Sequence, residues 1–266
     1  MKISVTKEDL STGLQNVQNV VGTRSTLPIL SNVLLMAGEN KLELRATDLE
    51  VSIHSTVPAK VEREGASTLP AKRLFGLVRE IESNEIEIEI NDREIATVKG
   101  GGANYKLHGI GAEEYPPEAK LKESGKIKVE QGKIREMIRK TGYAVSSDES
   151  RHTLNGIYVD AEEDKIKMVA TDGRRLALVE EEIEGGTKAN FILPTKAVAE
   201  LQRMLQTEGE VEIGVGETHA EFKVPQENGE TVKIHSKLVE GNFPNYKQVI
   251  PSESKERITV VREELL

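Results

Sequence analysis

Cysteine and tryptophan are both absent from this 266-residue chain, and aromatic residues make up only 3% of it. Without cysteine there are no disulfides, no thiolate metal ligands and no thiol nucleophile. With so few aromatics, the core must be built from aliphatic side chains. No apolar run reaches the roughly 18 residues that a membrane-spanning helix needs, and the sequence opens on a strand pattern at residues 1–5. We therefore expect a cytoplasmic protein that does not enter a membrane.

A surplus of positive charge is also missing, because 36 Lys and Arg stand against 45 Asp and Glu, for a net charge of −9. This balance argues against a simple basic nucleic-acid-binding protein. The average hides a local difference. Four segments with apolar residues at helical spacing together carry +5, so the rest of the chain carries −14; they are residues 7–21, 72–81, 131–142 and 195–206. Basic helices suit a protein that turns its helices towards a polyanion, although they are also compatible with an ordinary solvated face.

Alternating apolar and polar residues predict half-buried strands in many short segments, among them residues 41–46, 85–90, 165–169 and 211–215. Thr6 is the expected N-cap of the first helix. Since each half of the sequence holds two helices and many strands, we predict an α+β fold.

The two halves are copies of one another, at a constant offset of 124 residues. Three pairs of segments share this offset: residues 3–10 with 127–134, 46–48 with 170–172, and 68–72 with 192–196. A third copy of the same opening starts at Ile258 and runs to the last residue.

The repeat predicts two equivalent units at residues 1–124 and 125–256, followed by the start of a third unit, cut short, at 257–266. The other interpretation of the last segment is an edge strand of the second unit.

Several motifs in this order resemble the bacterial beta sliding clamp, the beta subunit of DNA polymerase III. They are residues 24–32, 154–156, 170–177 and 236–246. The resemblance implies tandem DNA-clamp domains, each with two helices packed on two antiparallel β-sheets. In that family two three-domain chains form a ring around double-stranded DNA, with helices lining the hole, and the ring tethers the polymerase. It catalyses no reaction and needs no cofactor.

The resemblance and the basic helices together predict DNA-contacting residues. Two loops of the family map to Arg24 and to residues 147–151. In the second loop Asp148 and Glu149 stand where a neutral polar residue is common, which leaves Arg151 as the expected contact. The full set is Arg24, Arg73, Arg79, Lys133, Arg139, Lys140, Arg151, Lys196 and Arg203.

The family's pocket for short peptides of the polymerase alpha subunit, the clamp loader and other clamp-binding proteins also maps onto the second unit. Its apolar residues would hold a hydrophobic anchor, and Arg175 would orient a carbonyl or an acidic group. Asp172 and Gly173 also fit an ordinary turn, with Asp172 capping backbone N–H groups and Gly173 at positive φ. The third domain supplies the opposite wall, so we expect weak peptide binding. The mapped residues are Leu154, Thr171, Gly173, Arg175, Leu176, Pro244 and Val249.

Enzymatic function finds no support in the residue pattern. The five histidines show no metal-ligand spacing, and residues 100–102 are best explained as a glycine-rich hairpin turn. We expect no catalytic residue, no metal and no cofactor. The family forms a homodimeric ring, but a chain that lacks the third domain would be monomeric or altered in assembly. Two alternatives to the family's ring therefore remain. One is a monomeric interaction module that does not encircle DNA, and the other is a six-domain ring of three two-domain chains.

Overall fold

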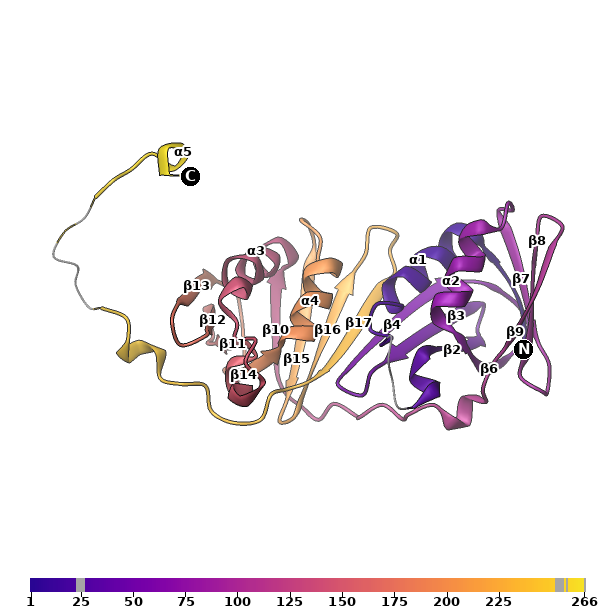
Figure 1. Cartoon of the computed structure of the whole chain (residues 1–266), viewed down its shortest axis with the longest axis horizontal. Coiled ribbons are helices and arrows are strands. Elements are labelled where there is room, and N and C mark those ends of the chain that lie inside the picture. The colour runs from indigo at the N-terminus through magenta and orange to yellow at the C-terminus, as the bar shows by residue number, and fades with distance from the viewer. Residues whose placement is uncertain (23–26, 252–255, 257, 266) are drawn as a thin grey trace.

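The computed structural model describes residues 1–22, 27–251, 256 and 258–265. Within these residues, four helices follow the pattern of buried apolar residues on one face, and a short fifth helix lies near the C-terminus. Figure 1 shows the first four along one side of an elongated molecule, with the strands beneath and beside them. The helices are α1 (Lys7–Val17), α2 (Ala71–Glu80), α3 (Gln131–Thr141), α4 (Thr195–Met204) and α5 (Arg262–Leu265).

In the part of the chain that the structure describes, the strands form three antiparallel sheets. The first has the order β5 (Lys60–Arg63), β1 (Lys2–Thr6), β7 (Glu85–Ile90), β8 (Ile95–Gly100), β9 (Ala103–His108). The second has the order β10 (Glu123–Glu130), β15 (Glu210–Gly216), β16 (His219–Pro225), β17 (Thr231–Lys237), β4 (Val51–Pro58), β3 (Lys41–Thr47), β2 (Asn32–Gly38), β6 (Gly65–Pro70). The third has the order β13 (Leu176–Glu182), β12 (Lys165–Thr171), β11 (Gly156–Ala161), β14 (Ala189–Pro194).

The offset of 124 residues recurs in the bounds of the elements. It carries α1 onto α3, α2 onto α4, β3 onto β12 and β6 onto β14 without a shift at either end. Each half has two helices and two sheets, as the family resemblance implied. The eight-stranded sheet joins the halves, because β17 of the second pairs with β4 of the first.

The core is aliphatic and continuous through both halves. Leu10 and Leu14 of α1 are fully buried, as are Leu74 of α2 and Leu201 of α4. Each lies on the face that its helix turns towards the strands, which is the side that the apolar spacing predicts. Leucine, isoleucine and valine side chains thus form most of the core of a chain that has few aromatic residues.

The local predictions are confirmed in most respects. The four alternating segments are strands β3, β7, β12 and β15. Thr6 caps α1, since its hydroxyl accepts a hydrogen bond from the backbone N–H of Asp9. Gly101 and Gly102, at φ values of 56° and 85°, form the two-residue turn between β8 and β9, the backbone that a type I′ hairpin requires.

The predicted helix over residues 7–21 is too long. In the structure α1 ends at Val17. The chain then turns, and the N–H of Val21 donates to the carbonyl of Gln18. Val20 and Val21 are still buried. Their apolar character therefore reflects burial in a turn, which periodicity alone does not separate from a last helical turn.

The segment after residue 257 forms no strand where the structure describes it, so an edge strand of the second unit is wrong. Ile258 is 82% exposed. Helix α5 begins at Arg262, the position equivalent to Lys7 when Ile258 is aligned with Ile3. Across the described residues, no helix is long and apolar enough to cross a membrane.

Candidate nucleic-acid interface and peptide-binding surface

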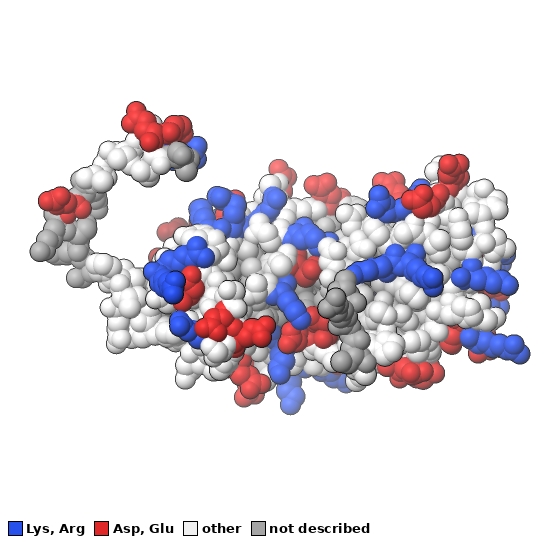
Figure 2. Space-filling view, viewed as in Figure 1, with Lys and Arg blue, Asp and Glu red and all other residues white. Residues whose placement is uncertain are grey.

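The helices place most of the predicted DNA-contacting residues on one side of the molecule. Helix α2 contributes Arg73 and Arg79, which are both exposed. The guanidinium of Arg79 lies 5.8 Å from the ring centre of Phe75, its neighbour one turn earlier. In the described part of the chain no ion pair within 4 Å engages either arginine. Figure 2 shows basic side chains recurring along the helix side, with acidic ones between them.

Helix α3 presents its cations in two different states. Lys140 is exposed, whereas Arg139 forms a two-pronged pair with Glu136, with an Nη2–Oε2 distance of 2.7 Å. An exposed pair of this kind is worth little stability, so a phosphate could replace Glu136. Lys133 lies at the other end of the helix, where its Nζ donates to the carbonyl of Glu182 at 3.2 Å.

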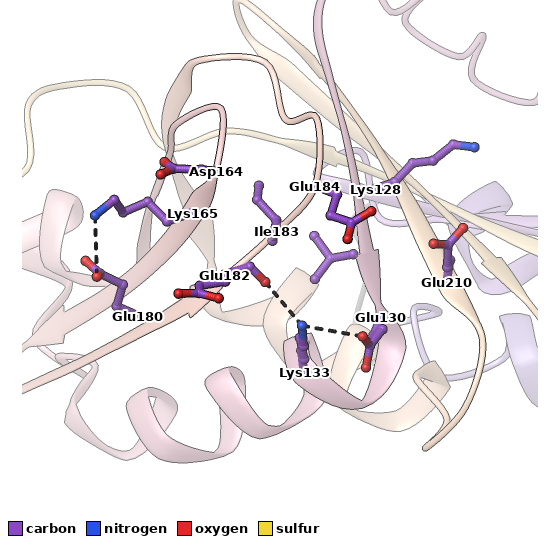
Figure 3. Close-up of a pocket in the computed structure, with 11 residues that line it drawn as sticks. Lys128, Glu130, Lys133, Asp164, Lys165, Glu180, Glu182, Ile183, Glu184 and Glu210 are labelled. Atoms are coloured by element: carbon purple, nitrogen blue, oxygen red, sulfur yellow. Dashed lines mark hydrogen bonds and ion pairs between the residues drawn. The ribbon is translucent and has the colours of Figure 1, made fainter.

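Lys133 borders an open cavity of about 720 Å³ that is lined by strands β10, β12, β13 and β15 and by the start of α3. Figure 3 shows Lys133 between Glu130 and the backbone of Glu182. Six carboxylates outnumber three lysines in the lining, so the cavity does not suit a polyanion. The charged residues are Glu130, Asp164, Glu180, Glu182, Glu184, Glu210, Lys128, Lys133 and Lys165.

Helix α4 uses its two cations to join the halves of the molecule. The Nζ of Lys196 contacts Asp48 at 2.8 Å and Glu50 at 3.0 Å, both in the first half. Arg203 donates from Nη2 to the carbonyl of Asn16 at 2.7 Å and from Nη1 to that of Gln15 at 3.2 Å. These carbonyls lie near the C-terminal end of α1, where the helix dipole favours a cation. Lys196 and Arg203 are therefore already engaged, unlike Arg73 and Lys140.

The two predicted loop contacts differ in what can be said of them. Arg24 lies outside the described residues. Arg151 is exposed in a 3-10 segment at Glu149–Leu154, with Nη1 3.4 Å from the carbonyl of Asp172 and Nε 3.5 Å from Asp148. Hydrogen bonds from Ser150 hold the pKa of Asp148 below its usual range. This acidic loop therefore lies beside the predicted peptide-binding surface.

The turn between β12 and β13 has the predicted geometry. Asp172 Oδ1 accepts hydrogen bonds from the backbone N–H groups of Arg174 and Arg175, and Gly173 has a φ of 87°. These backbone bonds and the Arg175 guanidinium lower the pKa of Asp172. Thr171 Oγ1 donates to the carbonyl of Arg175 at 2.7 Å. The equivalent Asp48 makes the same bonds to Glu50 and Val51, so the turn itself is structural.

The predicted peptide-binding residues differ in exposure. Leu154 is buried and Leu176 is half-buried, whereas Pro244 is exposed and Val249 is 69% exposed. Arg175 is bonded to Asp172 at 3.0 Å and lies 5.6 Å from the ring centre of Tyr143. Sequence reasoning missed Tyr143, which is 60% exposed. Its position just after α3, outside the apolar stripe of the helix, could have indicated an exposed aromatic side chain.

A second group that the sequence did not reveal lies where β17 meets β4. His54 Nε2 is 2.6 Å from Glu118, and His235 Nε2 is 2.5 Å from Glu221. The two imidazole rings are 5.7 Å apart. Since 181 positions separate the histidines in the sequence, no local spacing could have paired them. In the described residues no group of three or more such side chains is arranged to hold a metal ion.

This group should make the stability depend on pH. Burial lowers the pKa of His235 below its ordinary 6.5. The unfolded chain therefore takes up a proton that the folded chain resists, and stability falls as the pH drops through 6.5. Burial is the largest single influence on Glu118 and would raise its pKa, but the hydrogen bond from His54 and the nearby charges of His54, His235 and Arg45 together lower it. The folded protein therefore continues to lose stability at lower pH, where Glu118 takes up its proton.

We expect the midpoint of thermal unfolding to fall between pH 7.5 and pH 5.5, and to fall less in His235→Gln. A matched control is His108→Gln, which changes an exposed histidine on β9. Equal pH dependence in all three proteins would show that His235 does not contribute.

Comparison with known proteins places both halves in one family. Residues 1–120 match the N-terminal domain of the DNA polymerase III beta subunit, and residues 128–245 match its central domain. The beta sliding clamp of Chlamydia muridarum is 32% identical across the whole chain, which spans 72% of that protein. The beta sliding clamp of Bacillus subtilis is 30% identical, and the chain again spans 72% of it.

Solved structures agree with these matches. The sliding clamp from Bacillus subtilis superposes with a TM-score of 0.90 at 28% identity, over 96% of this chain and 69% of that one. A sliding clamp from Pseudomonas aeruginosa bound to griselimycin gives a TM-score of 0.88 at 32% identity, over 96% and 69%. From the internal repeat, the three sheets and these matches, the chain belongs to the beta sliding clamp family, the beta subunit of DNA polymerase III.

Proposed function

We propose that this chain acts in a ring that encloses duplex DNA in the cytoplasm and holds the replicative polymerase at the primer end. The arrangement of the four long helices carries the proposal. They lie on one side with exposed cations, while the sheets form the other surfaces (Figure 1). The two clamp domains are proposed at residues 1–124 and 125–256. The chain contributes no catalytic group in this role.

Helix-borne cations would contact phosphates without reading bases, and such contacts are independent of sequence and weakened by salt. Weak contacts also allow the ring to slide. Arg73, Arg79, Arg139 and Lys140 are the proposed principal contacts, because they are exposed and at most paired with a surface carboxylate. Lys133 and Arg151 are proposed as secondary contacts, and Arg24 stays a prediction from the family resemblance.

Topological binding can be tested directly with nicked circular DNA. We expect protein assembled on the circle to remain bound during gel filtration at a salt concentration that strips it from linear DNA of the same length. Linearising the circle should then release it, because a ring can leave only over a free end. Equal retention on circular and linear DNA would instead identify a binding module that does not encircle DNA.

The partners proposed for the second half are peptides of the polymerase alpha subunit, the clamp loader and other clamp-binding proteins. Leu154, Leu176 and Val249 would form an apolar surface for a hydrophobic anchor, with Pro244 at its border. Thr171, Gly173 and Arg175 would supply the polar side. The charge of Arg175, already shared with Asp172 and the Tyr143 ring, is available to a carbonyl or a carboxylate.

Val249→Asp is expected to weaken binding of a peptide with a hydrophobic anchor about tenfold, or roughly 1.4 kcal/mol. Val249 is 69% exposed, so the change should not affect folding. Val260→Asp is the control, since Val260 is 54% exposed and outside this surface. Fluorescence anisotropy of a labelled peptide measures both. Equal affinity in the two variants would remove Val249 from the site.

A further inference from the structure

The turn between β3 and β4 has the same hydrogen bonds as the predicted peptide-binding turn of the second half. Thr47 Oγ1 donates to the carbonyl of Val51 at 3.0 Å and accepts from the N–H of Leu49 at 3.0 Å. Thr171, 124 positions later, makes both bonds with the equivalent partners. The first half therefore presents the same turn at residues 47–51.

The segment after β9 likewise matches the segment after β17. Tyr115 lies in one buried cluster with Leu34, and Phe243 stacks on Tyr158 with the ring centres 5.0 Å apart. Leu34 and Tyr158 are equivalent at the offset of 124. A proline follows each of the two aromatic residues, so Pro116 stands where the second half has its predicted peptide-binding proline.

An open cavity of about 110 Å³ lies where this turn and this segment meet the second half. Its wall in the first half includes Leu49, Val51 and Pro116. Its opposite wall comes from β16 and β17 through His219 and His235. Figure 1 shows the segment between β9 and β10 running along the lower edge of the molecule, below the four long helices. Both walls of the cavity are thus present in this chain.

Leu49 has an unfavourable backbone conformation that exposes an apolar side chain. Its φ is 77°, in the left-handed region that glycine adopts at the equivalent position, 173. Among the described non-glycine residues with positive φ, Leu49 is the one with an apolar side chain. The side chain is 56% exposed. Neither backbone preference nor core burial accounts for a leucine here, which points to contact with another molecule.

The charge around this cavity is opposite to that of the predicted peptide-binding turn. Glu50 and Glu118 line the cavity, and its lining, made entirely of described residues, contains no lysine or arginine. In the second half Arg174 replaces Glu50, and Arg175 replaces Val51. A cationic group is therefore favoured at this cavity, whereas the second-half turn favours an anionic group or a carbonyl.

Glu50 can exchange its present partner for a ligand. Its carboxylate contacts the Nζ of Lys196 at 3.0 Å and is 60% exposed. Lys196 also contacts Asp48 at 2.8 Å. Because Lys196 keeps Asp48 when Glu50 turns away, a cationic ligand at Glu50 leaves no lysine without a partner.

We propose that this cavity is a second peptide-binding site, which takes one branched apolar side chain of a partner protein with a lysine or arginine beside it. About 110 Å³ is room for one such side chain, since a cavity of about 150 Å³ holds a benzene molecule. Leu49, Val51 and Pro116 supply the apolar contacts, and Glu50 and Glu118 supply the charge.

The likeness to a peptide-binding surface rests on the proposed function, whereas the cavity and its charge do not. The two sites lie on different halves and favour opposite charges. One chain can therefore hold two different partner segments at the same time.

Two short peptides test the preference for charge. The probes are Gly-Lys-Leu-Lys-Gly and Gly-Glu-Leu-Glu-Gly, each blocked at both ends and titrated into the full chain with labelled leucine and valine methyl groups. We expect the lysine peptide to shift the methyl resonances of Leu49 and Val51 in NMR spectra and to bind more tightly than the glutamate peptide.

Two substitutions test the assigned walls. Leu49→Gly should weaken binding of the lysine peptide about fivefold, because apolar contact is lost. It should not lower the midpoint of thermal unfolding, since glycine adopts a φ of 77° without strain. Glu50→Gln should weaken binding of the lysine peptide about threefold. Glu114→Gln is the control and should keep the affinity, because it removes the same charge from an exposed residue outside the lining.

The proposal is overturned if the two peptides bind equally, if neither shifts the two methyl resonances, or if Leu49→Gly and Glu50→Gln both keep the affinity of the unchanged protein. Val249→Asp separates this cavity from the second-half surface. If Val249→Asp weakens the lysine peptide as much as Leu49→Gly does, the peptide binds in the second half and the proposal is wrong. If Val249→Asp leaves every peptide unaffected while Leu49→Gly weakens the lysine peptide, the cavity stands and the second-half site does not.

Discussion

Replacing Arg73, Arg79, Arg139 and Lys140 together by alanine is expected to flatten the salt dependence of duplex binding. Each neutralised phosphate contributes a slope of about 0.9 to log K against log salt. Loss of four contacts should therefore reduce the slope by about three to four. The change should be the same for duplexes of unrelated sequence, because phosphate contacts carry no base information. Fluorescence anisotropy at several salt concentrations measures the slope.

The control must remove the same charge from another surface. Alanine at Lys41, Lys60, Lys99 and Lys233 does so, because all four are exposed residues of strands. This variant should keep a slope close to that of the unchanged protein. If both quadruple variants lose the same slope, binding follows net charge alone, and the helix side is not a specific interface for DNA.

Leu14→Ala is expected to lower the free energy of unfolding by about 2–5 kcal/mol. Leu14 is fully buried on the face of α1 that packs against β4 and β3. Removing its side chain beyond Cβ loses apolar burial and leaves a cavity that the surrounding strands cannot fill completely. Because β4 also joins the two halves, the loss of stability should affect both halves.

Urea unfolding followed by circular dichroism gives the free energy. Gln15→Ala is the matched control, since Gln15 is exposed and only its backbone carbonyl contacts Arg203. That variant should stay within about 0.5 kcal/mol of the unchanged protein. A loss below about 1 kcal/mol for Leu14→Ala would mean that α1 contributes little to the packed core.

Local pattern was sufficient for the fold class and for most elements. Alternation located β3, β7, β12 and β15, and the offset of 124 matched the bounds of α1 with α3. Such features depend on neighbouring residues, which the sequence lists in order. The end of α1 was predicted too late because Val20 and Val21 are buried without being helical. Burial produces an apolar residue in a turn as well as in a helix.

The candidate site was predictable in part. The turn at Asp172 and Gly173 followed from residue chemistry, because an aspartate cap and a glycine at positive φ act within four residues. The contacts of this turn with Arg151 and Tyr143 did not follow from the sequence, since they depend on how the 3-10 segment at Glu149–Leu154 and the end of α3 fold back towards it. The exposed state of Val249 likewise needed the structure.

The sequence by itself determined a cysteine-free, aliphatic α+β protein built from a repeat, with basic helices in an acidic chain. These properties arise from composition and from short-range periodicity. Only the tertiary structure decided which cations are free. Arg203 meets a carbonyl 188 positions away, and Lys196 meets Asp48 at a separation of 148, whereas Arg73 and Lys140 face outward. Contacts between distant segments depend on how the two halves pack, and no spacing along the chain encodes that directly.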